Sequence, residues 1–131
     1  MTAKVLFTGK THITSGPDGA ARSDNGVVDV KLAQPHPAAE NLFGAAWSTC
    51  YLGAFELAAA QRKIVLPDHP SVDAEIQLFN GADGFFLKGR LNVTVPGLDR
   101  EIAEGLLHAA HEICPYSKAV KGNVEVETVL V

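Results

Sequence analysis

The feature that most constrains this fold is an uncharged stretch at residues 41–55, which reads NLFGAAWSTCYLGAF. Apolar and small residues recur at helical spacing within and just after it. That stripe consists of Leu42, Ala46, Cys50, Gly53 and Leu57. The other faces are also mostly apolar, so we expect a central core helix that is buried on every side. The stretch is shorter than the roughly 18 uninterrupted apolar residues of a membrane span, so we expect no membrane insertion.

Length and charge exclude several classes of protein. A chain of 131 residues fits one domain, residues 1–131, which can bury about two thirds of its unfolded surface. A net charge of −4 argues against a nucleic-acid partner. The first residues, MTAKVLFTGK, contain no apolar signal segment, so we expect a cytoplasmic protein. Two distant cysteines then indicate reduced or catalytic thiols more than a structural disulfide.

The part of the chain before the core helix has the pattern of a β-meander. Residues 4–14 alternate loosely and predict a strand, and residues 15–19 (SGPDG) predict a turn. The Asn-Gly pair at residues 25–26 predicts a hairpin, followed by a strand at 27–32. Residues 34–37 (QPHP) are expected to form a non-helical linker to the core helix.

The part after the core helix predicts more strands and a second helix. Strands are expected at residues 71–79, 85–95 and 123–131, with a turn at 80–84. Asp99 is a candidate N-cap for a helix through about Ile113, which Pro115 interrupts. Because the connections between strands are hairpin-length, the sequence predicts an α+β fold with antiparallel sheet rather than a parallel doubly wound fold.

The two cysteines are the first candidates for chemistry. Cys50 lies in the middle of the predicted core helix, and Cys114 begins the segment CPYSKAVKGNVEV. Two interpretations remain open from the residues alone. Buried cysteines are commonly small core residues, whereas a reactive thiol needs a positive neighbour or a helix N-terminus to lower its pKa. The uncharged helix offers neither locally.

A metal site is a second candidate. His108, His111 and Cys114 share helical spacing and could offer three ligands. Pro115 is expected to break the helix there, and the sequence suggests no fourth ligand. We therefore expect two solvent-facing or hydrogen-bonded histidines and no metal, and a zinc-binding module remains the distant alternative.

Two longer motifs carry a family resemblance. The segments ENLFGAAWSTCYLGA and ICPYSKAVKGNVEV resemble the two cysteine motifs of the organic hydroperoxide resistance (Ohr) branch of the Ohr/OsmC family. The segments NGVVDVKL and EGLLHAAHEICPYS are also similar, so the resemblance covers nearly the whole chain. It implies an OsmC-like fold, with antiparallel sheets around two long core helices in an intertwined homodimer.

The resemblance also implies a thiol peroxidase of the stress response that needs no metal or organic cofactor. Cys50 would attack the O–O bond of a fatty-acid, alkyl or aryl hydroperoxide and become a sulfenic acid. Cys114 would then resolve it as a Cys50–Cys114 disulfide. The implied reductant is a lipoylated protein or dihydrolipoamide. Phe43, Trp47 and Tyr116 are the candidate walls of the substrate pocket.

Only one of the two charged residues implied by the resemblance stands at its expected position. Glu40 matches the family's acid, which holds an arginine that steadies the thiolate. Pro17 stands where the family usually has this arginine, and Arg22 is the candidate replacement. Glu40 is ten residues before Cys50, about 15 Å along one helix, so we expect Glu40 to reach the pocket from the partner subunit.

The missing arginine leaves an alternative function. The chain could be a related redox-sensitive or small-molecule-binding OsmC-like dimer with little peroxidase turnover. An assay with an alkyl hydroperoxide and dihydrolipoamide separates it from the peroxidase.

Overall fold

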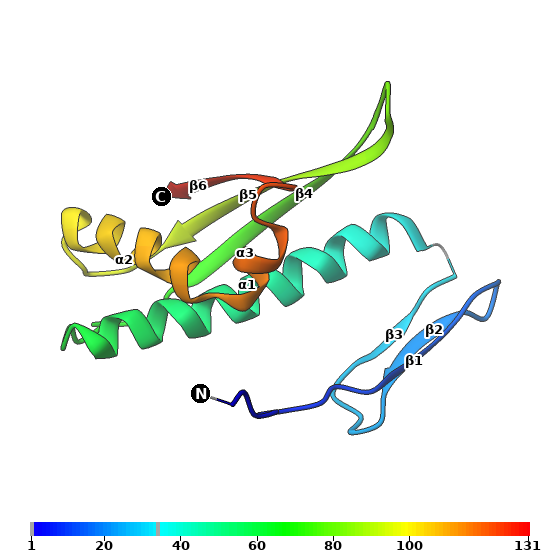
Figure 1. Cartoon of the computed structure of the whole chain (residues 1–131), viewed down its shortest axis with the longest axis horizontal. Helices are drawn as coiled ribbons and strands as arrows, with labels where there is room; N and C mark the ends of the chain where they lie inside the picture. Colours follow the sequence, from blue (N-terminus) through cyan, green and yellow to red (C-terminus); the bar gives the residue numbers. More distant parts are fainter. Residues whose placement is uncertain (1, 34) are drawn as a thin grey trace. The chain divides into compact units, whose positions relative to one another are not determined.

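Two compact units make up the chain, one ending at Ala39 and the other spanning Glu40–Val131. The computed structural model describes residues 2–33 and 35–131, apart from the side chains of residues 35–37. Within these residues no helix has the length and apolar character needed to cross a membrane. The chain forms six strands and three helices over its described part, as labelled in Figure 1. The α+β class is therefore confirmed.

The first unit is a small antiparallel sheet in the order β1-β2-β3. Its strands are β1 (Thr11–Thr14), β2 (Ala20–Ser23) and β3 (Asp29–Lys31). The predicted meander is confirmed, but the first strand is shorter than predicted. Strand β2 has four residues and pairs with the first strand only over Thr11–Thr14, and residues 4–10 form no strand.

The second unit contains a three-stranded sheet in the order β4-β5-β6. Strands β4 (Ser71–Gly81) and β5 (Gly84–Thr94) form the predicted antiparallel hairpin. Strand β6 (Glu125–Leu130), however, pairs parallel with β5. The purely antiparallel prediction was wrong here, because α2 (Arg100–Ile113) and α3 (Pro115–Val120) form a crossover that returns the chain in the same direction.

Helix α1 (Pro35–Gln61) is 27 residues long. The prediction of a non-helical linker was wrong for residues 35–37, since the first turn of a helix tolerates proline, and Gln34 lies outside the described residues. The helix ends at Gln61, and the chain then turns at Lys63, whose φ is 56°. The Lys63 N–H donates to the Ala60 carbonyl and the Ile64 N–H to the Ala59 carbonyl, which is the Schellman arrangement.

Helix α1 buries one face against the sheet and α2. Trp47, Tyr51 and Phe55 pack with Leu91 of β5 and Leu106 of α2 in one core. Figure 1 shows α1 and α2 on the same side of the β4-β5-β6 sheet. The prediction that α1 is buried on every side was wrong for the single chain.

The open face of α1 is part of the stripe predicted to be core. Ala46 and Gly53 are exposed, and Leu57 is 48% exposed. The sequence periodicity identified an apolar stripe correctly but did not show which face meets the sheet.

Gly89 of β5 lets α1 approach the sheet closely. A Cβ at this position would lie 3.1 Å from Cζ3 of Trp47, which is closer than two carbons pack. The absent side chain therefore leaves room for the indole, which is 1% exposed.

Helix α2 begins and ends close to the predicted residues. The Asp99 carboxylate accepts the Glu101 and Ile102 N–H groups at 3.0 and 3.2 Å, which confirms the N-cap. Cys114 ends α2, and Pro115 begins α3. The predicted interruption at Pro115 is therefore confirmed.

Candidate functional site

Cys114 lies at the joint between two helices of the second unit. Its backbone N–H donates to the Ala110 carbonyl at 2.8 Å and closes α2. Its sulfur accepts the Ser117 N–H at 3.5 Å as the N-cap of α3. Because Cys114 is 0% exposed, an external thiol or oxidant has no direct access to its sulfur in the single chain.

Cys50 meets Cys114 from α1. It is half-buried and packs against the core cluster that contains Cys114, and the Cys114 side chain is near enough to shift the pKa of the Cys50 thiol. Both are free thiols. The structure therefore brings together the two predicted cysteines, with Cys50 as the more accessible of the pair.

The surroundings of Cys50 in this unit do not activate it. Burial raises the pKa of the Cys50 thiol, and the Cys114 side chain raises it further. The backbone of Tyr116 lowers this pKa through a hydrogen bond, but the net direction is upward. Since the thiolate is the nucleophile, an additional cation would be needed to favour it.

The three predicted pocket residues differ in accessibility. Trp47 is 1% exposed, and its indole Nε1–H donates to Ser117 Oγ at 3.0 Å. Phe43 is partly buried and packs edge-on against Trp47, with ring centroids 5.7 Å apart. Tyr116 is 49% exposed and follows Pro115 in the turn beside Cys50. Phe43 and Tyr116 can therefore contact a ligand, while Trp47 is buried and packs against Phe43.

Glu40 lies near the start of α1, on the same helix as Cys50. It lines a cavity of about 210 Å³ with Gly44 and Ser48 of α1 and with residues of β4. The β4 residues are Val72, Ala74 and Ile76. Because α1 is continuous, Glu40 and Cys50 of one chain are separated by about 15 Å along its axis.

Arg22 belongs to the first unit. Its Nε donates to Asp29 Oδ1 at 3.0 Å across β2 and β3, and both side chains are exposed. Arg22 also lines a cavity of about 280 Å³ together with Pro17 and Lys31. Arg22, the candidate replacement, therefore shares a cavity with Pro17, the position that it is proposed to replace. Lys31 is a second base in this cavity, and the sequence did not indicate it.

The two histidines of α2 have different surroundings. His108 is exposed, and its Nε2 lies 3.8 Å from Glu112 Oε1. His111 is hydrogen-bonded through both ring nitrogens, to Ser117 Oγ at 2.8 Å and Thr128 Oγ1 at 2.7 Å. Among the described residues, no three His, Cys, Asp or Glu side chains gather where they could hold a metal ion.

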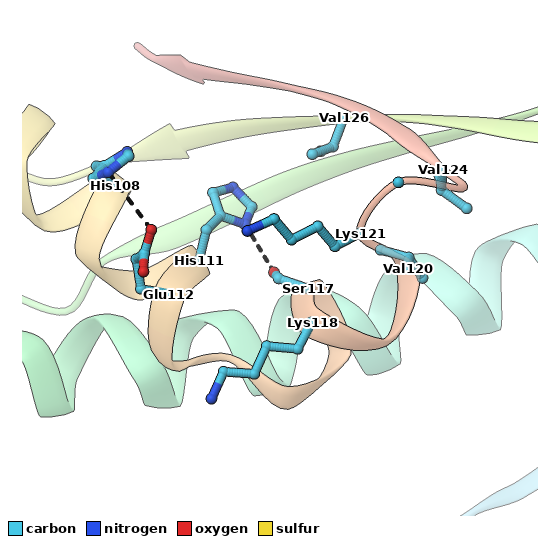
Figure 2. Close-up of a pocket in the computed structure, with 10 residues that line it drawn as sticks. His108, His111, Glu112, Ser117, Lys118, Val120, Lys121, Val124 and Val126 are labelled. Atoms are coloured by element: carbon cyan, nitrogen blue, oxygen red, sulfur yellow. Dashed lines mark hydrogen bonds and ion pairs between the residues drawn. The ribbon is translucent and has the colours of Figure 1, made fainter.

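Sequence reasoning missed Ser117 and Thr128 as partners of His111. Figure 2 shows His111 between α2, α3 and β6, with Ser117 facing its ring. The one available signal was the position of His111 on α2, next to Ala110 and four residues after Leu107. Ala110 and Leu107 are both buried. A polar side chain on such a face needs hydrogen-bond partners, but the sequence does not say which.

His111 makes stability depend on pH. Burial lowers its pKa, and His108 lowers it further. The unfolded chain, in which histidine has a pKa near 6.5, then binds the proton more tightly than the folded chain. Stability should therefore fall as the pH drops below about 6.5. The other titratable groups near His111 are Tyr51, Glu104, His108, Glu112, Lys118 and Lys121.

Urea unfolding at about pH 7.5 and 5.5 checks this prediction. His111→Gln should remove part of the loss of stability between the two pH values, and the exposed His108→Gln should retain it. An equal loss in wild type and His111→Gln would contradict the assignment.

This chain is similar to known proteins along nearly its whole length. A family model described as OsmC-like protein matches residues 32–129. The organic hydroperoxide resistance protein of Xanthomonas axonopodis pv. citri is 35% identical, with 97% of this chain and 96% of that protein covered. Organic hydroperoxide resistance protein OhrB of Bacillus subtilis is 35% identical over 93% of this chain and 96% of its own.

Solved structures are also similar to this chain along nearly its whole length. The crystal structure of OhrB of Bacillus subtilis has a TM-score of 0.84 at 36% identity and covers 97% of this chain and 100% of its own. An organic hydroperoxide resistance protein from Legionella pneumophila has a TM-score of 0.86 at 32% identity, with 97% and 98% covered.

Proposed function

Because this chain belongs to the OsmC-like family and matches its organic hydroperoxide resistance proteins, we propose that it reduces organic hydroperoxides with a pair of thiols. The observation that carries the proposal is that Cys50 packs against the core cluster containing Cys114 in the second unit, near enough for the Cys114 side chain to shift the pKa of the Cys50 thiol. The relatives align over 97% of the chain, and the family match crosses the boundary between the two units. We therefore treat residues 1–131 as one functional domain.

The proposed reaction has three steps. The Cys50 thiolate attacks the hydroperoxide oxygen, the O–O bond breaks, and the alcohol leaves after taking up a proton, so that Cys50 becomes a sulfenic acid. The Cys114 thiol attacks the Cys50 sulfur and water leaves, which forms the disulfide. A dithiol reductant of the dihydrolipoyl type then returns both cysteines to thiols and becomes a cyclic disulfide. The proposal places the protein in the cytoplasm, where glutathione and thioredoxin keep thiols reduced.

The exposure of the cysteines supports the roles proposed for them. Cys50 is half-buried while Cys114 is 0% exposed, so a hydroperoxide meets Cys50 first. Tyr116, whose backbone is hydrogen-bonded to Cys50 and whose side chain is 49% exposed, adds apolar surface beside it. In this proposal the partly buried Phe43, about two turns before Cys50 on α1, extends the apolar surface, which favours alkyl or aryl hydroperoxides over hydrogen peroxide.

A direct assay tests the function. Dihydrolipoamide oxidation should depend on protein and on cumene or tert-butyl hydroperoxide, and should be slower with hydrogen peroxide. Replacing dihydrolipoamide by reduced thioredoxin tests the proposed reductant. Formation of the Cys50–Cys114 disulfide without sustained alcohol production would favour the alternative, a redox-sensitive or ligand-binding protein, which Pro17 and the raised pKa of Cys50 already support.

We also propose that the protein is a homodimer. The exposed stripe of Ala46, Gly53 and Leu57 on α1 is an apolar surface that a second copy could cover. In such a dimer Glu40 of the partner subunit would act beside Cys50, since Glu40 of the same chain is about 15 Å away along the helix. Light scattering should give the mass of two chains, and the mass of one chain would contradict the dimer.

Arg22 is proposed as the cation that activates Cys50. Arg22→Ala should then raise the pKa of Cys50 and slow hydroperoxide reduction about tenfold, equivalent to about 1.4 kcal/mol. Alkylation rates across pH in a Cys114→Ser background measure this pKa. Lys31→Ala tests the second base of the same cavity, and Asp29→Asn is the control that removes the negative charge of the observed partner of Arg22. An alkylation profile unchanged by Arg22→Ala would remove Arg22 from the mechanism.

A further inference from the structure

One chain of hydrogen bonds links four elements of the second unit. Trp47 of α1 is bonded to Ser117 of α3, Ser117 to His111 of α2, and His111 to Thr128 of β6, at 3.0, 2.8 and 2.7 Å. Trp47 is 1% and Ser117 is 7% exposed. The bond between Trp47 and Ser117 is therefore shielded from competing water, and the two bonds of His111 are partly buried. Removal of the Ser117 hydroxyl leaves the buried indole N–H of Trp47 unsatisfied.

The chemistry of the groups gives the chain a direction. An indole N–H is only a donor, so Ser117 Oγ accepts from Trp47. The arrangement that satisfies the remaining atoms has the Ser117 hydroxyl donating to Nδ1 of a neutral His111, whose Nε2–H donates to Thr128 Oγ1. Burial, which lowers the pKa of His111, favours this neutral form.

Ser117 connects this chain to Cys114. Its hydroxyl takes part in the hydrogen bonds above, and its backbone N–H donates to Cys114 Sγ at 3.5 Å. Helix α3 has only six residues, too few to be stable alone. The position of the turn from Cys114 to Ser117 therefore depends on contacts with the surrounding elements.

We propose that Ser117 and His111 are positioning residues which hold the Cys114 turn in place for disulfide closure with Cys50. This inference rests on the proposed function and adds to it the residues that control the second step. Neither residue contacts the hydroperoxide in this proposal, so the first step, at Cys50, proceeds without them.

Single-turnover kinetics separate the two steps. With one equivalent of cumene hydroperoxide, Ser117→Ala should release cumyl alcohol at a rate within about twofold of wild type and close the disulfide about tenfold more slowly, equivalent to about 1.4 kcal/mol. Sulfenic acid on Cys50 should accumulate and be trapped by dimedone. Ser117→Thr, which retains the hydroxyl, should recover the closure rate.

Tyr51→Phe is the matched control. The Tyr51 hydroxyl is equally buried and donates to the Leu107 carbonyl at 2.8 Å, and its ring contacts His111 with centroids 4.6 Å apart. Its hydroxyl is not linked to Ser117, so Tyr51→Phe should leave closure unchanged. Equal slowing by Tyr51→Phe and Ser117→Ala would overturn the proposal, as would normal closure in Ser117→Ala.

A second route to closure avoids peroxide chemistry. Glutathione disulfide forms a mixed disulfide with the accessible Cys50 by thiol exchange, and Cys114 then attacks the Cys50 sulfur and releases glutathione. Slow glutathione release in Ser117→Ala would support the positioning role even if wild type fails to reduce hydroperoxides. If Ser117→Ala does not fold, His111→Gln breaks the chain at the next link and should slow the same step. Normal release in a folded His111→Gln would then overturn the proposal.

Discussion

Cys50→Ser should reduce hydroperoxide consumption to the rate measured without protein. The substitution removes the only thiol that a hydroperoxide reaches in the single chain, because Cys114 is 0% exposed. A serine hydroxyl is not ionised near neutral pH and is a weak nucleophile without an adjacent base. Loss of all alcohol formation, measured by chromatography, is the expected result.

The control for Cys50→Ser is a measurement that shows the variant still folds. Cys50 is half-buried, and serine is close to cysteine in size, so thermal unfolding should remain cooperative. Alcohol formation that persists in a folded Cys50→Ser protein would transfer the nucleophile to Cys114 and reverse the assignment of the two thiols.

Cys114→Ser should allow one turnover and no more. The substitution leaves Cys50 and the access of a hydroperoxide to it unchanged, so one equivalent of alcohol per chain should form at the wild-type rate. No thiol then resolves the sulfenic acid, and further hydroperoxide oxidises it to a sulfinic acid. Mass spectrometry of the peptide containing Cys50 detects that product.

The result that would contradict this prediction is steady turnover in Cys114→Ser with dihydrolipoamide. It would mean that the reductant attacks the sulfenic acid of Cys50 directly. The Cys50–Cys114 disulfide would then not be part of the cycle, and the positioning role of Ser117 would have no step to control.

Local features of the fold were predictable from the sequence. Asp99 and Pro115 identified the start and end of α2 because a carboxylate cap and a missing N–H act within one helical turn. The Asn-Gly pair at residues 25–26 correctly indicated a hairpin for the same reason. Signals of this kind need no knowledge of distant residues.

Features that depend on distant residues were not predictable. The parallel pairing of β6 follows from the path of the crossover, and its strand pattern alone is the same in either direction. The bonds of His111 require residues 117 and 128 to meet it, and the periodicity of α2 contains no information about either.

For the same reason, the cysteines of the candidate site were easier to predict than its charged residues. The cysteine pair came from two motifs of a known family, and the structure brings both thiols together. The prediction of Arg22 depended on its nearness to Pro17 along the chain and on its place in the same hairpin segment. The structure adds its bond to Asp29 and the neighbouring Lys31, which a linear comparison with Pro17 could not reveal.

The contact between Cys50 and Cys114 has a thermodynamic consequence. The proposed disulfide would close a loop of about sixty residues and so destabilise the unfolded chain by about 4 kcal/mol through lost entropy. The form that waits for peroxide, with both thiols free, would be the less stable of the two. Each turnover would then alternate the protein between a lower and a higher melting temperature, and heat resistance in a cell extract would report the fraction of chains that have reacted.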